Sequence, residues 1–179
     1  MHPRISEVLD YVDRQTATLH DAYESVPLER RSIRAAPDRW SPAEIVRHLD
    51  LVEQRMVARL ADLIEQARAL PPETETTTVL SQATTTRIID RTNRIVTTES
   101  LEPNEADAAR VWDDLMRTRR AFVEVVASGD GLALGAVSLS HPRLGAFSGY
   151  DWIAFIGSHM ARHAAQIRET NAALAARGD

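Results

Sequence analysis

The sequence contains no cysteine, which excludes disulfide bonds, thiolate metal ligands and a cysteine nucleophile. It has no excess of basic residues either: 21 lysines and arginines stand against 26 acidic residues, so no positive field favours nucleic acid or anionic lipid. No apolar run approaches the ~18 residues of a membrane-spanning helix. The N-terminal stretch MHPRISEVLDYVDRQ is charged throughout, unlike a secretory signal peptide. These absences predict a cytoplasmic protein that binds neither a membrane nor nucleic acid.

Internal repeats, low-complexity tails, glycine-rich phosphate loops and sustained strand alternation are also absent. The sequence instead has many hydrophobic residues, 44% of the chain, and much of it shows helical spacing. A chain of 179 residues fits one domain with a sizeable core. We therefore predict a single all-α domain over residues 1–179, built as a four-helix bundle.

Four segments carry an apolar stripe at helical spacing. They are residues 3–25, the stretch from 42 to the prolines at 71–72, residues 104–128 and residues 149–177. The second has a strong start signal, in which Ser41 can cap, Pro42 suits the first helical position and Glu44 completes a capping box. Asn104 is the predicted cap of the third helix, and Gly178 is the predicted stop of the fourth.

Residues 73–104 are rich in threonine and only weakly periodic. They allow a short helix near 82–94, but most of the segment is expected to be an extended connector. A short loop would force helices two and three to be antiparallel, whereas a connector of this length can cross the bundle and leave them parallel. The later stretch SGDGLALGAVSLSHPRLGAFSG is punctuated by glycines and is expected to be a loop.

Two of the six histidines, His159 and His163, lie one turn apart in the apolar stretch SHMARHAAQI. On a helical wheel both fall within about 20° of the centre of the buried stripe. Buried imidazoles need partners, because an unpaired buried polar group costs about 1–3 kcal/mol. One interpretation is a hydrogen-bonded core pair. We favour a metal site, because histidines at i and i+4 direct two nitrogens toward one point.

A catalytic metal site usually has three protein ligands and keeps a position for water or substrate. His48 on the second helix and His20 on the first each lie about 60° from the centre of their stripe, so periodicity alone does not choose between them. The weaker candidates are His2, near the terminus, His141, in a loop before a proline, and the carboxylates of Glu44 and Asp50.

Two segments, WSPAEIVRHL and HPRLGAFSGYDWIAFIGSHMARHAAQI, resemble the DinB/YfiT-like superfamily, and the resemblance covers most of the chain. Its most specific part is Trp-Ser-Pro-x-Glu with a histidine four residues later, followed by His-x3-His in the last helix. The resemblance implies a four-helix bundle with a long crossover between helices two and three, often as a homodimer. It also implies a divalent metal ion bound by His48, His159 and His163.

Members of that family transfer groups to or from low-molecular-weight thiols, or are described as metal-dependent hydrolases. The resemblance thus implies a metal-dependent enzyme with a small-molecule substrate, and we favour a transferase that uses a low-molecular-weight thiol. The alternatives are a hydrolase using metal-activated water and a non-enzymatic metal- or ligand-binding stress protein. Three imidazoles suit zinc, nickel and iron alike.

Two further residues are candidates for contacts with substrate or with the metal ligands. Arg119 falls between Leu115 and Phe122 on the apolar face of the third helix, where it could pair with a core acid or anchor a substrate carboxylate. Gln166 lies about 40° from the stripe centre of the last helix and could support the metal ligands. Trp40, Trp112, Trp152 and Phe155 are interpreted as packing residues.

Overall fold

The computed structural model describes residues 1–71, 79–92, 97–104, 106–141 and 144–177. Within these residues the α-helices are α1 (Pro3–Glu24), α2 (Pro42–Arg68), α3 (Gln82–Ile89), α4 (Val111–Ser128) and α5 (Gly149–Arg177). A hairpin of strands β1 (Ser138–His141) and β2 (Gly145–Ser148) lies between α4 and α5, and short 3-10 helices form at η1 (Leu28–Arg30) and η3 (Glu99–Leu101).

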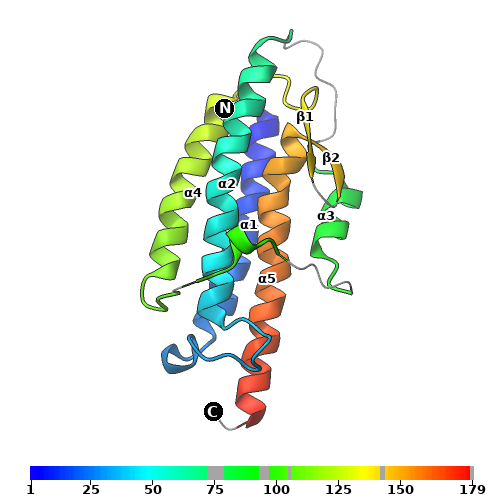
Figure 1. Cartoon of the computed structure of the whole chain (residues 1–179). Coiled ribbons are helices and arrows are strands. Elements are labelled where there is room, and N and C mark those ends of the chain that lie inside the picture. The colour runs from blue at the N-terminus through cyan, green and yellow to red at the C-terminus, as the bar shows by residue number, and fades with distance from the viewer. Residues whose placement is uncertain (72–78, 93–96, 105, 142–143, 178–179) are drawn as a thin grey trace.

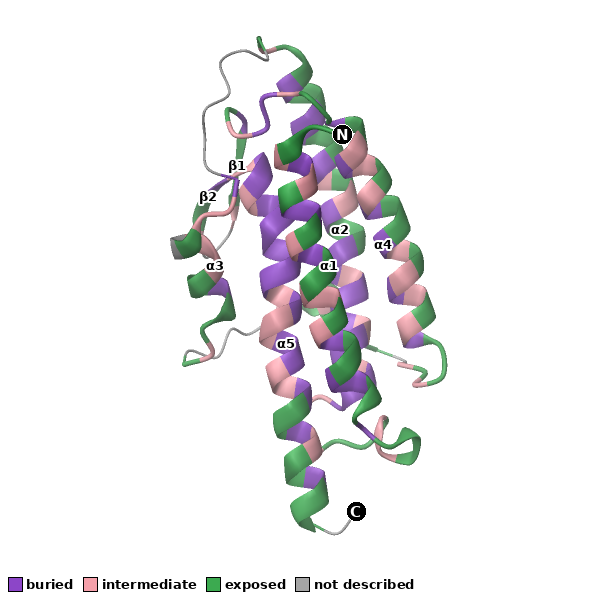
Figure 2. Ribbon diagram, turned by 180° about the vertical axis from the view of Figure 1, so that it is seen from behind, coloured by how far each residue is buried: buried purple, intermediate pink, exposed green. Residues whose placement is uncertain are grey.

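The long helices α1, α2, α4 and α5 form a bundle (Figure 1). α1 packs mainly against α5, while α2 packs against both α4 and α5. The chain between α2 and α4 crosses from one end of the bundle to the other, so these two helices run in the same direction (Figure 1). Buried residues line the faces that the helices turn toward one another (Figure 2). The predicted all-α bundle with a long crossover is confirmed.

None of the described helices combines the length and the apolar character that crossing a membrane requires. The helices are amphipathic, and their buried residues repeat at the spacing expected of one helix face against a core.

The start of α2 follows the predicted capping box. The Ser41 hydroxyl accepts a hydrogen bond from the Glu44 backbone N–H (3.2 Å), and the Glu44 carboxylate accepts one from the Ser41 backbone N–H (2.8 Å). Pro42 occupies the first turn, where the missing N–H has no helical partner to lose. Arg34 pairs with the same carboxylate. Glu44 is therefore used to hold the helix start.

α1 and α5 approach each other closely at Gly157. A Cβ added there would lie 2.8 Å from a ring carbon of Tyr11, so only glycine allows this approach without a shift of the ring. Beside it, the hydroxyls of Tyr11 and Ser158 are hydrogen bonded at 2.9 Å. These contacts fix the height of α5 against α1 immediately before His159.

The predicted start of the third helix is wrong by about two turns, because α4 begins at Val111 rather than near Asn104. Asp107 explains the difference. Its carboxylate accepts a hydrogen bond from the backbone N–H of Ala109 (3.0 Å), and its backbone carbonyl closes a turn with Arg110 (3.0 Å). A side chain that bonds its own backbone in a turn competes with helix formation.

The segment that was expected to be a loop contains the β1–β2 hairpin, whose antiparallel register places His141 opposite Gly145. Each strand has four residues, too few for the alternation by which a strand is recognised in a sequence. Gly145 has a φ of +90°, a backbone angle that residues other than glycine rarely adopt. The indole N–H of Trp152 donates to the Leu139 carbonyl (3.1 Å) and ties the hairpin to α5.

The threonine-rich connector contributes α3 and η3 beside the bundle, while its residues 73–78 and 93–96 lie outside the described part. α3 confirms the expected short helix and lies against α5 (Figure 1). Two arginines join them. Arg162 donates to the Ile88 carbonyl (3.3 Å), and Arg91 donates to the Arg162 carbonyl (3.0 Å) and pairs with Glu169 (2.6 Å).

A buried ion pair joins α2 and α4 inside the bundle. Arg119 donates from Nε and Nη2 to the two carboxylate oxygens of Glu53, at 2.5 and 2.8 Å. It also donates to the hydroxyl of Thr16 on α1 and contacts the sulfur of Met160 on α5 at 3.1 Å. Both charged side chains are buried. Of the two interpretations of Arg119, pairing with a core acid is the one that these contacts match.

Removing one partner of this ion pair should destabilise the bundle strongly. We expect Arg119→Met to lower the free energy of unfolding by about 3–5 kcal/mol, because Glu53 is left as an unpaired carboxylate in the core. The matched control is Arg117→Met on the same helix, since its exposed pair with Asp114 contributes at most about 1 kcal/mol. Urea unfolding followed by circular dichroism measures both losses. Equal small losses would contradict the expectation.

Candidate metal centre

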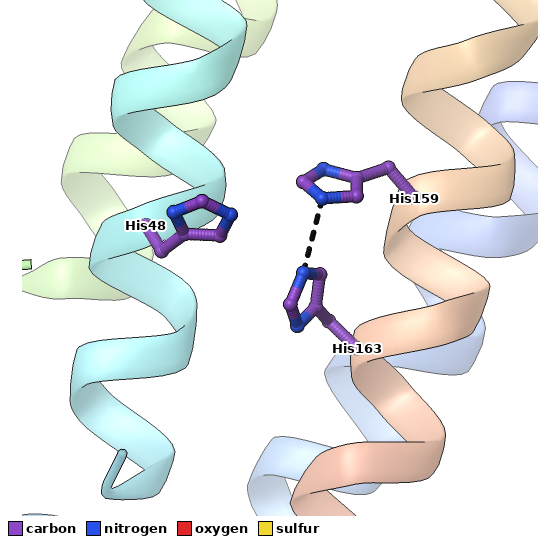
Figure 3. Close-up of side chains that lie close together, drawn as sticks. All are labelled: His48, His159 and His163. Atoms are coloured by element: carbon purple, nitrogen blue, oxygen red, sulfur yellow. Dashed lines mark hydrogen bonds between the residues drawn. The ribbon is translucent and has the colours of Figure 1, made fainter. Parts of the chain in front are cut away.

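His48 on α2 and His159 and His163 on α5 converge between the two helices (Figure 3). One nitrogen from each ring lies within 4.8 Å of the other two. The His48 ring centroid is 5.3 Å from that of His159 and 5.2 Å from that of His163. Among the described residues, no Asp or Glu joins this triad. The three donors are therefore all imidazoles.

Hydrogen bonds at Nδ1 orient two of the three rings. His48 Nδ1 lies 2.8 Å from the backbone carbonyl oxygen of Leu101 in η3, and His163 Nδ1 lies 2.8 Å from Oε1 of Gln166. A carbonyl oxygen can only accept, so each of these Nδ1 atoms carries a proton and the Nε2 of the neutral ring keeps its lone pair. Partners of this kind fix the tautomer and the orientation of a metal-binding imidazole.

The spacing of the α5 pair fits a single metal ion. His159 Nε2 and His163 Nε2 are 3.0 Å apart (Figure 3). Two nitrogens that each lie about 2.0–2.1 Å from one ion are about 2.8–3.4 Å apart at right-angled to tetrahedral geometry. Because the Nε2 of neutral His163 has no proton, the bond between the two rings requires the proton on His159 Nε2. Binding of a metal ion by the two Nε2 atoms would thus require only that His159 carry its proton on Nδ1 instead of Nε2.

Burial keeps the triad uncharged. His48 and His163 are 5% and 6% exposed, whereas His159 is partly exposed. Burial is the main cause that lowers the pKa of each ring, and the pKa values of His159 and His163 lie well below the ordinary value. The neighbouring imidazoles lower these two pKa values further. Only a neutral imidazole binds a metal, so the triad suits metal binding at neutral pH.

Aromatic rings flank the triad on two sides. The Trp40 ring centroid lies 4.7 Å from that of His48. The Phe155 ring stacks on His159 at 5.1 Å, with 17° between the ring planes. These two residues and the buried Trp152 are predicted to pack, and Trp40 and Phe155 pack against the candidate metal ligands His48 and His159.

The other histidines lie outside the triad. His20 is exposed on α1 and packs against Trp112 at 4.8 Å, so the structure brings His48 rather than His20 to the α5 pair. His2 is the N-cap of α1. His141 ends β1, with its ring centroid 5.5 Å from that of Phe155.

Of the polar candidate residues, Gln166 lies at the triad, whereas Glu44, Asp50 and Arg119 have other partners. Glu44 holds the start of α2, and Asp50 is buried on the α4 side of that helix, where it accepts a hydrogen bond from Thr118 (2.6 Å). Arg119 is paired with Glu53. Gln166 lies at the triad, bonded to His163.

The sequence profile of the DinB superfamily matches residues 11–167. The chain belongs to the DinB superfamily. The matched range includes all three histidines of the triad, as well as the crossover between α2 and α4. A search of curated proteins and a search of solved structures found no match to this DinB-superfamily protein.

One group at the site has no counterpart in the sequence analysis, namely the backbone carbonyl of Leu101 that orients His48. Every residue has such a carbonyl, so residue type gives no signal for it. η3 lies in the weakly periodic connector, and its contact with α2 joins residues 53 positions apart. A contact of this kind becomes visible only when the path of the connector is known.

Gln166 should matter for metal affinity rather than for folding. We expect Gln166→Leu to weaken zinc binding by about 10- to 100-fold, because His163 loses the acceptor that fixes its Nδ1 proton. Gln166→Glu keeps an acceptor and should retain most of the affinity. Calorimetric titration of each metal-free variant with zinc measures the affinity. The control is Gln66→Leu, because Gln66 is an exposed residue on α2. Equal affinities of Gln166→Leu and the control would remove Gln166 from the site.

Metal-free protein should lose stability in mild acid. The triad has lower pKa values in the folded chain than the ordinary value of about 6.5, so protonation favours the unfolded chain. The free energy of unfolding should be at its full value above pH about 6.5 and fall as the pH drops below it. A variant with glutamine at all three positions should show a shallower decline in chemical unfolding. Identical pH profiles would exclude the triad as the cause.

Proposed function

We propose that this DinB-superfamily protein is a divalent-metal-dependent enzyme that transfers a group to or from a low-molecular-weight thiol. The observation that carries the proposal is the triad of uncharged imidazoles, whose ligand nitrogens lie within 4.8 Å of one another. When bound, a divalent ion would supply a Lewis acid that lowers the pKa of a thiol or of water. His48, His159 and His163 would hold this ion, and Leu101 and Gln166 orient two of these rings.

The thiol would have to come from a cosubstrate, because the chain has no cysteine. Neutral ligands leave the positive charge of a divalent ion uncompensated, which favours an anionic ligand such as a thiolate. We expect a thiol to enter past His159, because it is the partly exposed member of the triad. The buried rings of His48 and His163 and the adjacent side chain of Phe155 keep the rest of the site dry.

The acidity of the nucleophile is the reason why we favour thiol transfer over hydrolysis. Hydrolysis at helical two-histidine metal motifs uses a glutamate as general base to remove a proton from water. A free thiol has a pKa of about 8.5, against about 15.7 for bulk water, so a thiol needs far less help to lose its proton. The thiol is therefore the nucleophile that we favour at this site.

The proposal predicts thiol-dependent turnover that depends on the triad. Zinc-loaded protein should accelerate thioether formation between N-acetylcysteine and 1-chloro-2,4-dinitrobenzene, with release of chloride, measured by absorbance. His159→Ala and His48→Ala should lose bound metal, measured by mass spectrometry, and lose the rate enhancement. His20→Ala is the matched control and should keep both, because His20 lies on α1 outside the triad.

Two other results would give different conclusions. Metal-dependent cleavage of p-nitrophenyl acetate without any added thiol, and no thioether formation, would replace the transferase by a hydrolase. Stoichiometric metal with no turnover in either assay would favour a metal-binding protein without catalytic activity.

A further inference from the structure

Two arginines of α2 share the helix face that carries His48. Arg55 and Arg59 follow His48 by seven and eleven positions, so at about 100° per residue both lie within about 20° of its direction. α2 runs beside α5, and His48 points from α2 toward the two histidines of α5 (Figures 1 and 3). The face that provides one ring of the triad therefore continues along the α2–α5 interface with two cationic side chains.

The contacts of the two arginines agree with this placement. Arg55 donates from Nη2 to the hydroxyl of Ser100 (2.9 Å), and the next residue, Leu101, bonds a ring of the triad through its carbonyl. Arg59 places its guanidinium carbon 5.4 Å from the ring centroid of Trp152 on α5. Arg55 therefore lies beside the connector at the triad, and Arg59 reaches across from α2 to α5.

Aromatic rings of α5 connect Arg59 to the triad. The ring centroid of Trp152 lies 5.8 Å from that of Phe155, which lies 5.1 Å from that of His159. Trp152 and His159 are seven residues apart on α5, which is about 10 Å along the helix axis. The guanidinium over Trp152 is therefore at a distance from the triad that one small molecule can span.

Arg59 is available to bind an anion. It is partly exposed, and in the part of the chain that the structure describes it has neither an ion pair nor a hydrogen bond. An aromatic ring contacts a guanidinium at its face and leaves the N–H groups at its edge for a carboxylate. Arg119, considered from the sequence as a carboxylate anchor, differs in this respect, because Glu53 accepts from its Nε and Nη2 in the core.

We propose that Arg59 binds a carboxylate of the thiol cosubstrate while the sulfur of the same molecule is bound at the triad. The inference rests on the proposed function and narrows the cosubstrate to one class, thiols with a carboxylate several bonds away from the sulfur. The thiolate would meet a divalent ion whose charge the neutral imidazoles leave uncompensated, and the carboxylate would meet the guanidinium. Binding at both ends would fix the direction in which the thiol lies along the α2–α5 interface.

Thiol binding to cobalt-loaded protein tests the inference without any turnover. The probes are 6-mercaptohexanoate and 6-mercaptohexanol, which have the same carbon chain but end in a carboxylate and in a neutral hydroxyl. The sulfur-to-cobalt charge-transfer absorption gives the Kd of each probe. We expect Arg59→Met to raise the Kd of 6-mercaptohexanoate about three- to tenfold, as for a partly exposed ion pair, and to leave that of 6-mercaptohexanol unchanged.

Two further variants separate an ion pair from a packing effect. Arg59→Lys keeps the positive charge but not the bidentate geometry, so it should retain part of the preference for 6-mercaptohexanoate. Arg120→Met is the matched control, because Arg120 is exposed on α4, a helix that provides no ring of the triad. This variant should bind both probes like the original protein.

The remaining outcomes would overturn the inference. Unchanged binding of 6-mercaptohexanoate by Arg59→Met would remove Arg59 from the site, while thiol binding at the triad would stand. Equal weakening of both probes would mean that Arg59 only supports the packing of Trp152. If cobalt-loaded protein gave no charge-transfer absorption with either thiol, or if the protein bound no cobalt, the inference and the proposed function would both be wrong.

Discussion

A single buried guanidinium connects the four bundle helices. Arg119 on α4 is paired with Glu53 on α2, donates to Thr16 on α1 and contacts Met160 on α5. Burial raises the pKa of Glu53, so the carboxylate depends on the arginine to remain charged in the core. A buried pair of this kind tolerates little change in geometry, because a displaced partner leaves an uncompensated charge. The network therefore favours one relative placement of the helices over all others.

That placement matters because the histidine triad is divided between two helices. Met160 contacts Arg119 and is the next residue after His159, so the ion-pair network and the triad share one turn of α5. A shift of α5 by one residue would move its side chains about 1.5 Å along the axis and turn them about 100° around it, which would direct its two imidazoles away from His48. The close contact of Gly157 with Tyr11 fixes the same turn from the side of α1. The core thus positions the site through packing and charge pairing on both sides of α5.

The sequence predicts the parts of this arrangement that depend on local spacing. The stripe of α1, the capping box at Ser41 and the central position of His159 and His163 on α5 all follow from residues within a few positions of one another. The start of α4 does not, because Asp107 bonds its own backbone and overrides the helical period around it. Periodicity also leaves His20 and His48 equal. The family resemblance selects His48, and the packing of α2 against α5 gives the physical reason; that packing depends on the crossover between α2 and α4.

The residues that periodicity misses lie around the histidine triad and not in the bundle core. Leu101 reaches His48 from the connector, and the hairpin brings His141 to Phe155, although neither segment shows a strong pattern in the sequence. The bundle itself could hold the same three imidazoles around many different substrates, because fold and ligand set do not determine the reaction. Selectivity must then come from groups that a substrate meets beyond the metal. In this chain the connector places the Leu101 carbonyl at His48 and the hairpin places His141 at Phe155, so the segments with the weakest sequence signal are the ones that shape the surroundings of the triad.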